Sequence, residues 1–362
     1  MINNLLLKNF KCFEYLKVEF KNVNILTGCN GMGKSTIIQA LLLLKQSEAN
    51  LMTRKRLMLH GEYVDLGTGK DILYESAGED QDISIGIKMN DIDEVYNFEY
   101  SPYTDYLNLK DSTLYTHTVS FDNMVYLSAF RIAPKRLYDI SNENDVQKHV
   151  FGCDGLYTIQ YLNLFGSKPI LPELVTKEER YPNTLINQVE CWLEEISPDI
   201  SVNTVLDSEK KIVQLGYTFT EGNQRTNVYS SINVGFGITY VLPVIVTLLS
   251  AQKDDVILVE NPEAHIHPKG QRKLGELIAL AGAAGIQVIV ETHSDHILNG
   301  IRLSVKNNVL NSDATNILYF YKDKNDNYRH KFEIPHIKGN GKIDYWPEGF
   351  FDEWDNALME LL

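Results

Sequence analysis

A glycine-rich segment at residues 28–36 carries the residue types that bind phosphate groups. It reads GCNGMGKST and fits the pattern G-x-x-x-x-G-K-[ST] at every fixed position. Glycines allow a tight turn in which backbone N–H groups point inward, and the helix expected next adds its positive N-terminal end. The lysine can reach the β- and γ-phosphates of a nucleotide such as ATP, and the serine hydroxyl can bind Mg²⁺. The residues expected to contact the nucleotide are Asn30, Gly31, Gly33, Lys34, Ser35 and Thr36.

Two further polar groups follow apolar strands in the last third of the chain. Glu260 comes directly after Val256-Ile257-Leu258-Val259, and the carboxyl end of such a strand is where open α/β sheets bind ligands. We therefore assign both residues to the Mg²⁺ site: Ser35 binds the ion, and Glu260 holds its water shell. His293 follows the next apolar strand, at residues 287–290, and is placed there to contact a γ-phosphate.

Alternating strands and helices must position these groups. The pattern predicts strands at residues 5–7, 15–20 and 23–26, a buried helix from Lys34 to about Ser47, and a helix at 269–281 between the two apolar strands. Apolar strands separated by helices imply a parallel sheet that is covered on both faces.

The middle of the chain has a different character. Short alternating runs between about Ile83 and Ala129 predict a β-rich lobe, and residues 182–196 predict an amphipathic helix before strands at 211–220 and 225–230. Residues 318–334 predict a hairpin between two strands. Sustained heptads are absent between residues 50 and 230, so no long coiled coil is expected. Arg131, after a strand, is a candidate for a phosphate contact or a salt bridge.

Composition narrows the class of protein. The chain has 362 residues, and its 34 Lys and Arg against 48 Asp and Glu give a net charge of −14, which argues against an overall basic nucleic-acid coat. Hydrophobic residues at 44% are enough to build a core. The 4 cysteines lack CxxC spacing, and no membrane span or signal peptide is visible, so a cytoplasmic location is expected.

The motifs resemble those of a known group. NFKCFEYLKVEF…NILTGCNGMGKST is similar to the start of the SMC/RecF/OLD-type ABC ATPases, and ENPEAHIHP…ETHSDHIL is similar to that group's acidic strand and switch histidine. The segment Asp344–Asp352 resembles the tail of a bacterial subfamily found beside defence genes. The resemblance implies an ATPase of bacterial antiphage defence, Septu-like and without a nuclease domain.

The chain departs from the group at one catalytic position. In the wider group the acid that corresponds to Glu260 is followed by a glutamate that polarises water, whereas this chain has Asn261. An amide cannot accept a proton from the water, so hydrolysis is slow or Glu263 supplies the carboxylate. The sequence leaves both alternatives open. The expected catalytic set is Glu260, Asn261, Glu263 and His293.

The resemblance also implies a site shared between two subunits. Such ATPases close the site with a glycine-containing helix start from a second copy, and Asn233, Gly235 and Gly237 stand where that signature belongs. ATP would then hold a homodimer together, which is able to assemble further. Pro243 would kink the following helix unless it lies in the first turn.

The expected fold is α/β, an ABC-type P-loop ATPase head with a mixed or parallel core sheet, a β-rich N-terminal lobe and a helical insertion. We expect one composite ATPase with the core at 1–50 and 230–335, the lobe at 51–130, the insertion at 131–229 and a tail at 336–362. The leading hypothesis is a sensor or regulator of a separate effector, a nuclease. The alternatives are a RecF-type ATPase that binds DNA directly and an OLD-like ATP-dependent nuclease.

Overall fold

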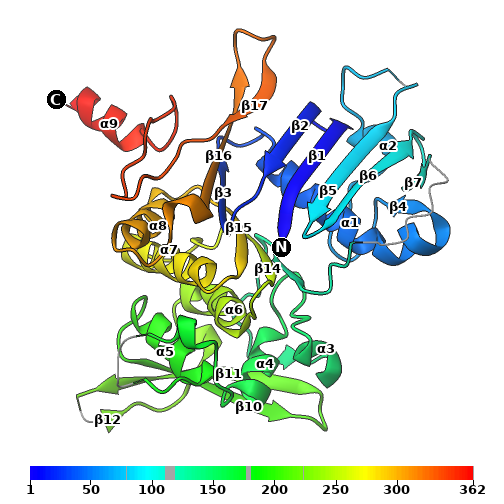
Figure 1. The fold of residues 1–362 in the computed structure, drawn as a ribbon. Helices are drawn as coiled ribbons and strands as arrows, with labels where there is room; N and C mark the ends of the chain where they lie inside the picture. Colours follow the sequence, from blue (N-terminus) through cyan, green and yellow to red (C-terminus); the bar gives the residue numbers. More distant parts are fainter. Residues whose placement is uncertain (79, 111–118, 177–180, 223, 362) are drawn as a thin grey trace.

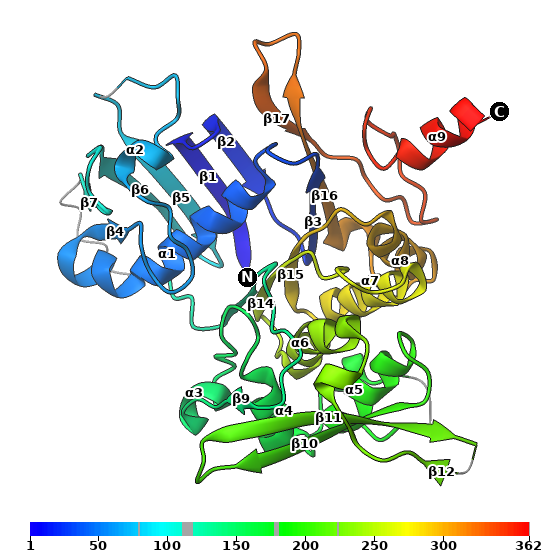
Figure 2. The same cartoon turned by 180° about the vertical axis from the view of Figure 1, so that it is seen from behind.

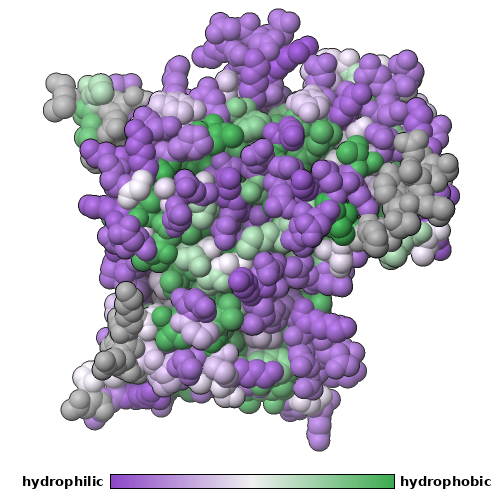
Figure 3. Space-filling model, viewed as in Figure 1, coloured by the Kyte–Doolittle hydropathy of each residue, from purple (hydrophilic) through white to green (hydrophobic). Residues whose placement is uncertain are grey.

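The structure is a computed structural model that describes the chain except residues 79, 111–118, 177–180, 223 and 362. The expected lobe and insertion therefore each include residues outside the described part. Within the described residues, no helix combines the length and the apolar character needed to cross a membrane. Polar side chains cover most of the face seen in Figure 1, and apolar ones gather in smaller patches between them (Figure 3).

The central sheet has the order β17-β16-β3-β15-β14-β8, and its strands are parallel except β17 at one edge. The bounds are β3 Val23–Gly28, β8 Met124–Leu127, β14 Val256–Glu260, β15 Gln287–Glu291, β16 Thr315–Asp323 and β17 Arg329–Glu333. The parallel sheet and the hairpin predicted at 318–334 are both present. Strand β3 lies between β15 and β16, although both follow it by more than 250 residues.

Side chains of the central sheet alternate between two hydrophobic cores. In β15, Val288 and Val290 belong to the core shared with helices α6, α7 and α8, whereas Ile289 belongs to the core shared with α1. The helix bounds are α1 Lys34–Arg54, α6 Phe236–Ser250, α7 Pro268–Ala283 and α8 Asp295–Lys306. Both faces of the strands are buried, which explains why their sequences are continuous apolar runs.

An antiparallel sheet in the N-terminal part, of order β2-β1-β5-β6-β7-β4, packs on the other side of α1. Its strands are β1 Ile2–Phe10, β2 Phe13–Glu19, β4 Arg56–Met58, β5 Ile83–Met89, β6 Ile92–Glu99 and β7 Tyr106–Leu109, with the short helix α2 at Gly69–Ile72. Because it receives core contacts from two sheets, α1 has a nearly continuous apolar run from Ile37 to Leu44.

A third sheet lies below α6 in Figures 1 and 2, next to helices α3, α4 and α5. Its strands are β9 Tyr138–Asp139, β10 Ile200–Asp207, β11 Ile212–Glu221, β12 Gln224–Arg225 and β13 Tyr229–Ser230. The helices are α3 Glu143–Gln147, α4 Thr158–Phe165 and α5 Leu185–Glu194, while α9 Glu353–Leu361 lies near the chain end. Short 3₁₀ turns occupy Pro172–Leu174, Ser231–Asn233 and Ser312–Ala314.

Several sequence predictions differ in detail from the structure. The helix expected to end near Ser47 continues to Arg54. The strand expected at 225–230 is instead two separate two-residue strands, because both pair with different parts of the long β11. Helix α6 runs through Pro243, with Gly155 packed so closely against the proline ring that a Cβ would lie 2.5 Å from it.

The sheets do not follow the expected domain ranges. Strands β1 and β2, from the range expected as core, pair in the same sheet as β5 from the lobe. Strand β8, from the lobe range, pairs with β14 in the central sheet. The division of the chain into core, lobe, insertion and tail stays a prediction.

Candidate functional site

The glycine-rich loop connects β3 to α1 and depends on glycine at two positions. Gly28 has φ +132°, and a Cβ there would lie 2.2 Å from the carbonyl oxygen of Phe320 in the neighbouring strand β16. Gly33 has φ +102°, and its Cβ would lie 2.6 Å from the ring of Phe13. Only glycine adopts this backbone without a steric cost. The loop thus lies tightly between β16 and the N-terminal sheet.

Lys34 is buried at the start of α1. Its Nζ donates hydrogen bonds of 2.9 Å to the carbonyl oxygens of Gly28 and Cys29, so the ammonium group lies over the loop. Burial lowers the pKa of Lys34, against the opposing charge of Glu291. The first amide groups of α1 have no partner within the helix, as at any helix start. The start of α1 thus joins a buried ammonium group to the end of the helix that carries partial positive charge.

Ser35 contacts a carboxylate that the sequence did not single out. Its Oγ donates to both carboxylate oxygens of Glu291, at 3.1 and 3.0 Å. Glu291 ends β15, opposite Glu260 of β14 in the parallel register. Burial, together with the charge of Glu260, raises the pKa of Glu291 to about 7. The sequence does show Glu291 as an acid directly after a predicted buried strand. It does not show which strands are neighbours, so the contact with Ser35 could not be predicted.

Glu260 lies at the same edge of the sheet and has a different partner. The hydroxyl of Tyr126, from β8, donates to its Oε1 at 3.1 Å. Burial raises the pKa of Glu260, and the bond from Tyr126 opposes this shift. The structure therefore brings Glu260 and Glu291 together behind the phosphate loop, with Glu291 on the side of Ser35.

Arg131 fixes the turn that follows β14. Its guanidinium group donates to the carbonyl oxygens of Glu260 and Asn261, both at 2.6 Å, and to that of Ser128 at 2.9 Å. Its Nε donates to Tyr240, whose ring lies 4.3 Å away. Neither of the sequence-based alternatives, a phosphate contact or a salt bridge, describes these contacts. Arg131 instead satisfies backbone carbonyls, because its planar fork offers several donors in one plane.

Glu263 and His293 meet at the end of this turn. The backbone N–H of His293 donates to Oε1 of Glu263 at 2.9 Å. The other carboxylate oxygen, Oε2, is buried and has no hydrogen-bond partner among the residues that the structure describes. The residue His293 is exposed at the surface, and partial desolvation, together with the charge of Lys34, lowers the pKa of its imidazole. The two residues are thus linked through the main chain of His293 and one carboxylate oxygen of Glu263.

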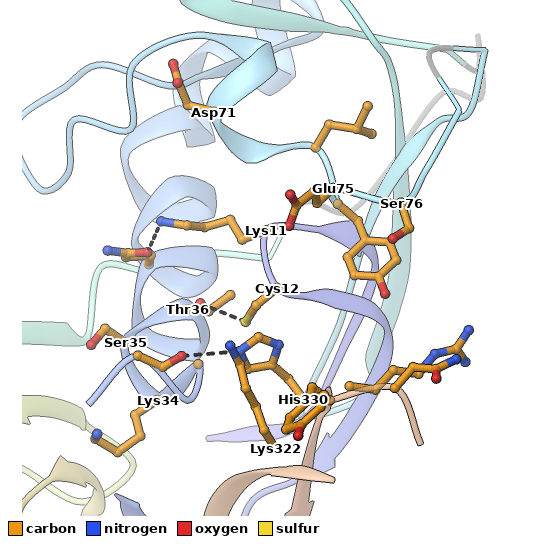
Figure 4. A pocket seen from close by; sticks show the side chains of 18 residues that line it. Lys11, Cys12, Lys34, Ser35, Thr36, Asp71, Glu75, Ser76, Lys322 and His330 are labelled. Carbon is orange, nitrogen blue, oxygen red and sulfur yellow. Dashed lines mark hydrogen bonds between the residues drawn. The ribbon is translucent and has the colours of Figure 1, made fainter. Parts of the chain in front are cut away.

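A cleft of about 590 Å³ opens beside the phosphate loop. Lys11 and Cys12 from the β1–β2 turn line it on one side, and Lys322 and His330 from the β16–β17 hairpin on another (Figure 4). His330 Nε2 lies 3.2 Å from the carbonyl oxygen of Gly31. Thr36 is buried, with its hydroxyl 3.6 Å from the Cys12 sulfur, whereas Asn30 and Gly31 are exposed. The cleft is large enough for the nucleoside part of a nucleotide.

The predicted signature lies elsewhere on the molecule. Asn233 and Gly235 are exposed before the start of α6, and a Cβ on Gly235 would meet nothing within 4 Å. Gly237 is different, because a Cβ there would lie 2.1 Å from the carbonyl oxygen of His265. None of these residues lines the cleft beside the phosphate loop. Within one chain, the structure does not bring the signature and the loop together.

Comparison with known proteins identifies the family. Residues 23–299 match the family described as "AAA domain, putative AbiEii toxin, Type IV TA system". The chain belongs to this AAA-domain family. The matched range contains the phosphate loop, the acidic strand ends and the signature. Residues 310–361 match a second family, described as "Protein of unknown function (DUF3696)". A search of curated proteins gives no match.

Solved structures show the fold of this AAA-domain protein. An SMC head bound to the C-winged helix domain of ScpA matches with a TM-score of 0.51 and 15% identity, over 93% of this chain and 98% of that one. The SMC head domain from Thermotoga maritima matches with a TM-score of 0.46 and 11% identity, over 92% and 98%. The α/β fold of an SMC head, expected from the sequence, is confirmed. The chain thus combines membership of an AAA-domain family with the fold of an SMC head.

Proposed function

We propose that this chain binds and hydrolyses ATP with Mg²⁺, and that two copies pair around the nucleotide to control a separate effector. The observation that carries the proposal is the contact between the phosphate loop and the acidic strand ends. Ser35 of α1 donates to Glu291, which lies in register with Glu260. A phosphate loop that faces buried carboxylates suits a nucleotide and its metal ion.

The residues present fit magnesium. A serine hydroxyl and carboxylates supply the oxygen ligands that this ion prefers, and Ser35 and Glu260 are the predicted pair. Magnesium, when bound, neutralises charge on the phosphates and assists their displacement. Lys34 would exchange its bonds to the carbonyls of Gly28 and Cys29 for phosphate oxygens.

Glu263 is the residue we propose as the base that activates water. Within the described part of the chain its Oε2 has no partner although it is buried, whereas Oε1 accepts a hydrogen bond from the backbone of His293. A carboxylate fixed through one oxygen leaves the other free to accept a proton. Asn261 lacks this capacity, and its role would be to orient the water. His293 would then contact the γ-phosphate.

Pairing of two copies is supported by the position of the signature. Asn233, Gly235 and Phe236, the first residue of α6, are exposed and lie outside the cleft of their own chain. A helix start carries partial positive charge and free N–H groups, which suit a phosphate of the other copy. Each site would therefore be completed by the partner chain, and hydrolysis would release the pair.

The proposed partner is an effector nuclease in bacterial antiphage defence, in the cytoplasm. The matched SMC head is bound to a domain of ScpA, and the matched family is described by a toxin of a toxin–antitoxin system. Both are compatible with an ATPase that acts on another protein. The net charge of −14 also favours a protein partner over direct binding to DNA.

The test combines three measurements on the purified chain. Phosphate release from ATP with Mg²⁺ should be detectable, and Lys34→Ala should abolish both ATP binding and turnover. Sedimentation velocity should show a dimer with a slowly hydrolysed ATP analogue and a monomer without it. Normal ATP binding by Lys34→Ala would overturn the site. Cleavage of DNA by the chain alone would favour an OLD-like nuclease, and tight, salt-sensitive duplex binding a RecF-type ATPase.

A further inference from the structure

Two carboxylates, the buried Glu291 and the partly buried Glu260, lie behind the phosphate loop, and of these two Glu291 contacts the loop serine. Glu291 is 6% exposed, and its two carboxylate oxygens share the hydrogen bond of the Ser35 hydroxyl, at 3.1 and 3.0 Å. Glu260 receives its bond from Tyr126, at 3.1 Å. The metal pair expected from the sequence, Ser35 with Glu260, is therefore not the pair in contact.

Strand order explains this arrangement. β15 lies between β3, which leads into the loop, and β14, which carries Glu260. Glu291 is in register with Leu26 of β3 on one side and with Glu260 on the other. It is therefore one strand nearer to the loop than Glu260. Tyr126 comes from β8, on the far side of β14, and so holds Glu260 from the side away from Ser35.

The chemistry of this pair suits a divalent cation. A hydroxyl and a carboxylate at hydrogen-bond distance offer adjacent oxygen donors, which Mg²⁺ prefers. Two carboxylates at neighbouring strand ends repel each other when both are ionised and buried. Lys34 is the nearest cation of the loop, and its ammonium group already bonds the carbonyls of Gly28 and Cys29. A divalent cation beside Ser35 would balance the negative charges of Glu291 and Glu260.

We propose that Glu291 is a magnesium-binding residue of this site, which acts together with the Ser35 hydroxyl, while Glu260 supports the water shell of the ion from the next strand. The proposal rests on the proposed ATP-binding function and adds a ligand to it. The two acids then have separate roles. Glu291 lies beside Ser35, where the ion would bind, and Glu263 accepts a hydrogen bond from the backbone of His293. The backbone N–H of Asn261 donates to the carbonyl oxygen of Glu291 at 2.8 Å, so the two positions are linked through the main chain.

The experiment measures metal-dependent binding and does not use turnover. A fluorescent ATP analogue is titrated into the full chain, once in EDTA and once in Mg²⁺. We expect Mg²⁺ to tighten binding to the wild type, and Glu291→Gln to remove about 10-fold or more of that gain while binding in EDTA is retained. Electron paramagnetic resonance with Mn²⁺ in place of Mg²⁺ should show a matching loss of ion affinity.

Control variants distinguish Mg²⁺ binding by Glu291 from the ATP binding on which it rests. Glu19→Gln removes an exposed acid at the end of β2 and should leave both affinities unchanged. Glu291→Asp keeps the charge on a shorter side chain and should retain part of the Mg²⁺ effect, which covers the case that Glu291→Gln does not fold. Full metal dependence in folded Glu291→Gln, with loss in Glu260→Gln, would overturn the proposal. Absence of analogue binding to the wild type in both buffers would instead overturn the ATP site itself.

Discussion

The backbone amide of His293 donates a 2.9 Å hydrogen bond to one carboxylate oxygen of Glu263, while the other oxygen is buried and has no partner in the described part of the chain. This geometry predicts that Glu263 accepts the proton of the attacking water. Glu263→Gln should lower ATP turnover about 100-fold or more, the usual contribution of a general base. Because Gln can still accept the bond from His293, ATP affinity should not change, which a binding titration checks.

Asn261→Glu tests the opposing account, in which the missing glutamate limits hydrolysis. If Glu263 is the base, phosphate release by Asn261→Glu should stay at or below the wild-type rate. A clear increase in turnover, together with an active Glu263→Gln variant, would assign the missing base to position 261. The two variants measured side by side therefore decide between the alternatives that the sequence left open.

The two signature glycines should respond differently to substitution. Gly235 has open space around it and a φ of −51° that any residue adopts, so Gly235→Glu should leave the unfolding temperature unchanged. It should prevent ATP-dependent pairing, because the new carboxylate would face phosphate in the other copy. Sedimentation velocity with a slowly hydrolysed analogue measures the dimer fraction. Normal pairing would show that α6 does not start at the interface.

Gly237→Ala should act on folding instead. Its Cβ would lie 2.1 Å from the carbonyl oxygen of His265, and a backbone atom cannot move away as a flexible side chain can. We expect a loss of about 1–3 kcal/mol in the free energy of unfolding, typical of overpacking. Denaturant titration of the nucleotide-free chain measures it, and an unchanged midpoint would contradict the close contact.

The raised pKa of Glu291 predicts that the free energy of unfolding depends on pH. Its pKa is about 7 in the folded chain, raised from 4.5 by burial and by Glu260 and Glu263, against Lys34 and Ser35. Between these values the unfolded state loses the proton first, so stability falls as pH rises through this window. Glu291→Gln removes the effect and should stabilise the nucleotide-free chain by roughly 1–3 kcal/mol at about pH 8.

Thermal unfolding in EDTA, monitored by circular dichroism, checks this difference. The melting temperatures of wild type and Glu291→Gln should approach each other at about pH 4.5 and below, where the carboxyl is protonated in both states. A gap of the same size across the whole pH range would show that the substitution acts through packing and not through ionisation.

Arg131 should stabilise the turn after β14 through the geometry of its hydrogen bonds and not through its positive charge. Arg131→Lys keeps the charge but loses the planar fork that bonds the carbonyls of Glu260 and Asn261. We expect about 1–3 kcal/mol less stability, from buried carbonyls left without a donor, and reduced turnover. Arg136→Lys is the matched control at an exposed position. Equal effects of both changes would contradict the role given to Arg131.

Local motifs made part of this site predictable. The loop at residues 28–36 and the strands before Glu260 and His293 depend on short-range patterns, and the structure has the expected strands and helix there. The contact between Ser35 and Glu291 depends on strand order, because β15 lies between β3 and β14, and single-strand patterns contain no information on order.

Other features of the structure could not be predicted from the sequence either. Arg131 donates hydrogen bonds to backbone carbonyls. Every residue has such a carbonyl, so the sequence does not indicate which ones Arg131 contacts. Strand β10, Ile200–Asp207, mixes polar and apolar residues and is mostly half-exposed, so it carried too weak an alternation to be predicted. Helix α4 is short, which leaves few turns in which a periodicity could be recognised.

The position of β3 between β15 and β16 has a consequence for synthesis of the chain. During translation, the phosphate-loop strand leaves the ribosome about 260 residues before either of its neighbours, so it lacks hydrogen-bonding partners for most of that time. Its apolar side chains and free edges are meanwhile available for wrong pairings. Nascent chains stopped before residue 287 should therefore fail to bind nucleotide, and they should be clients of chaperones that hold exposed strands.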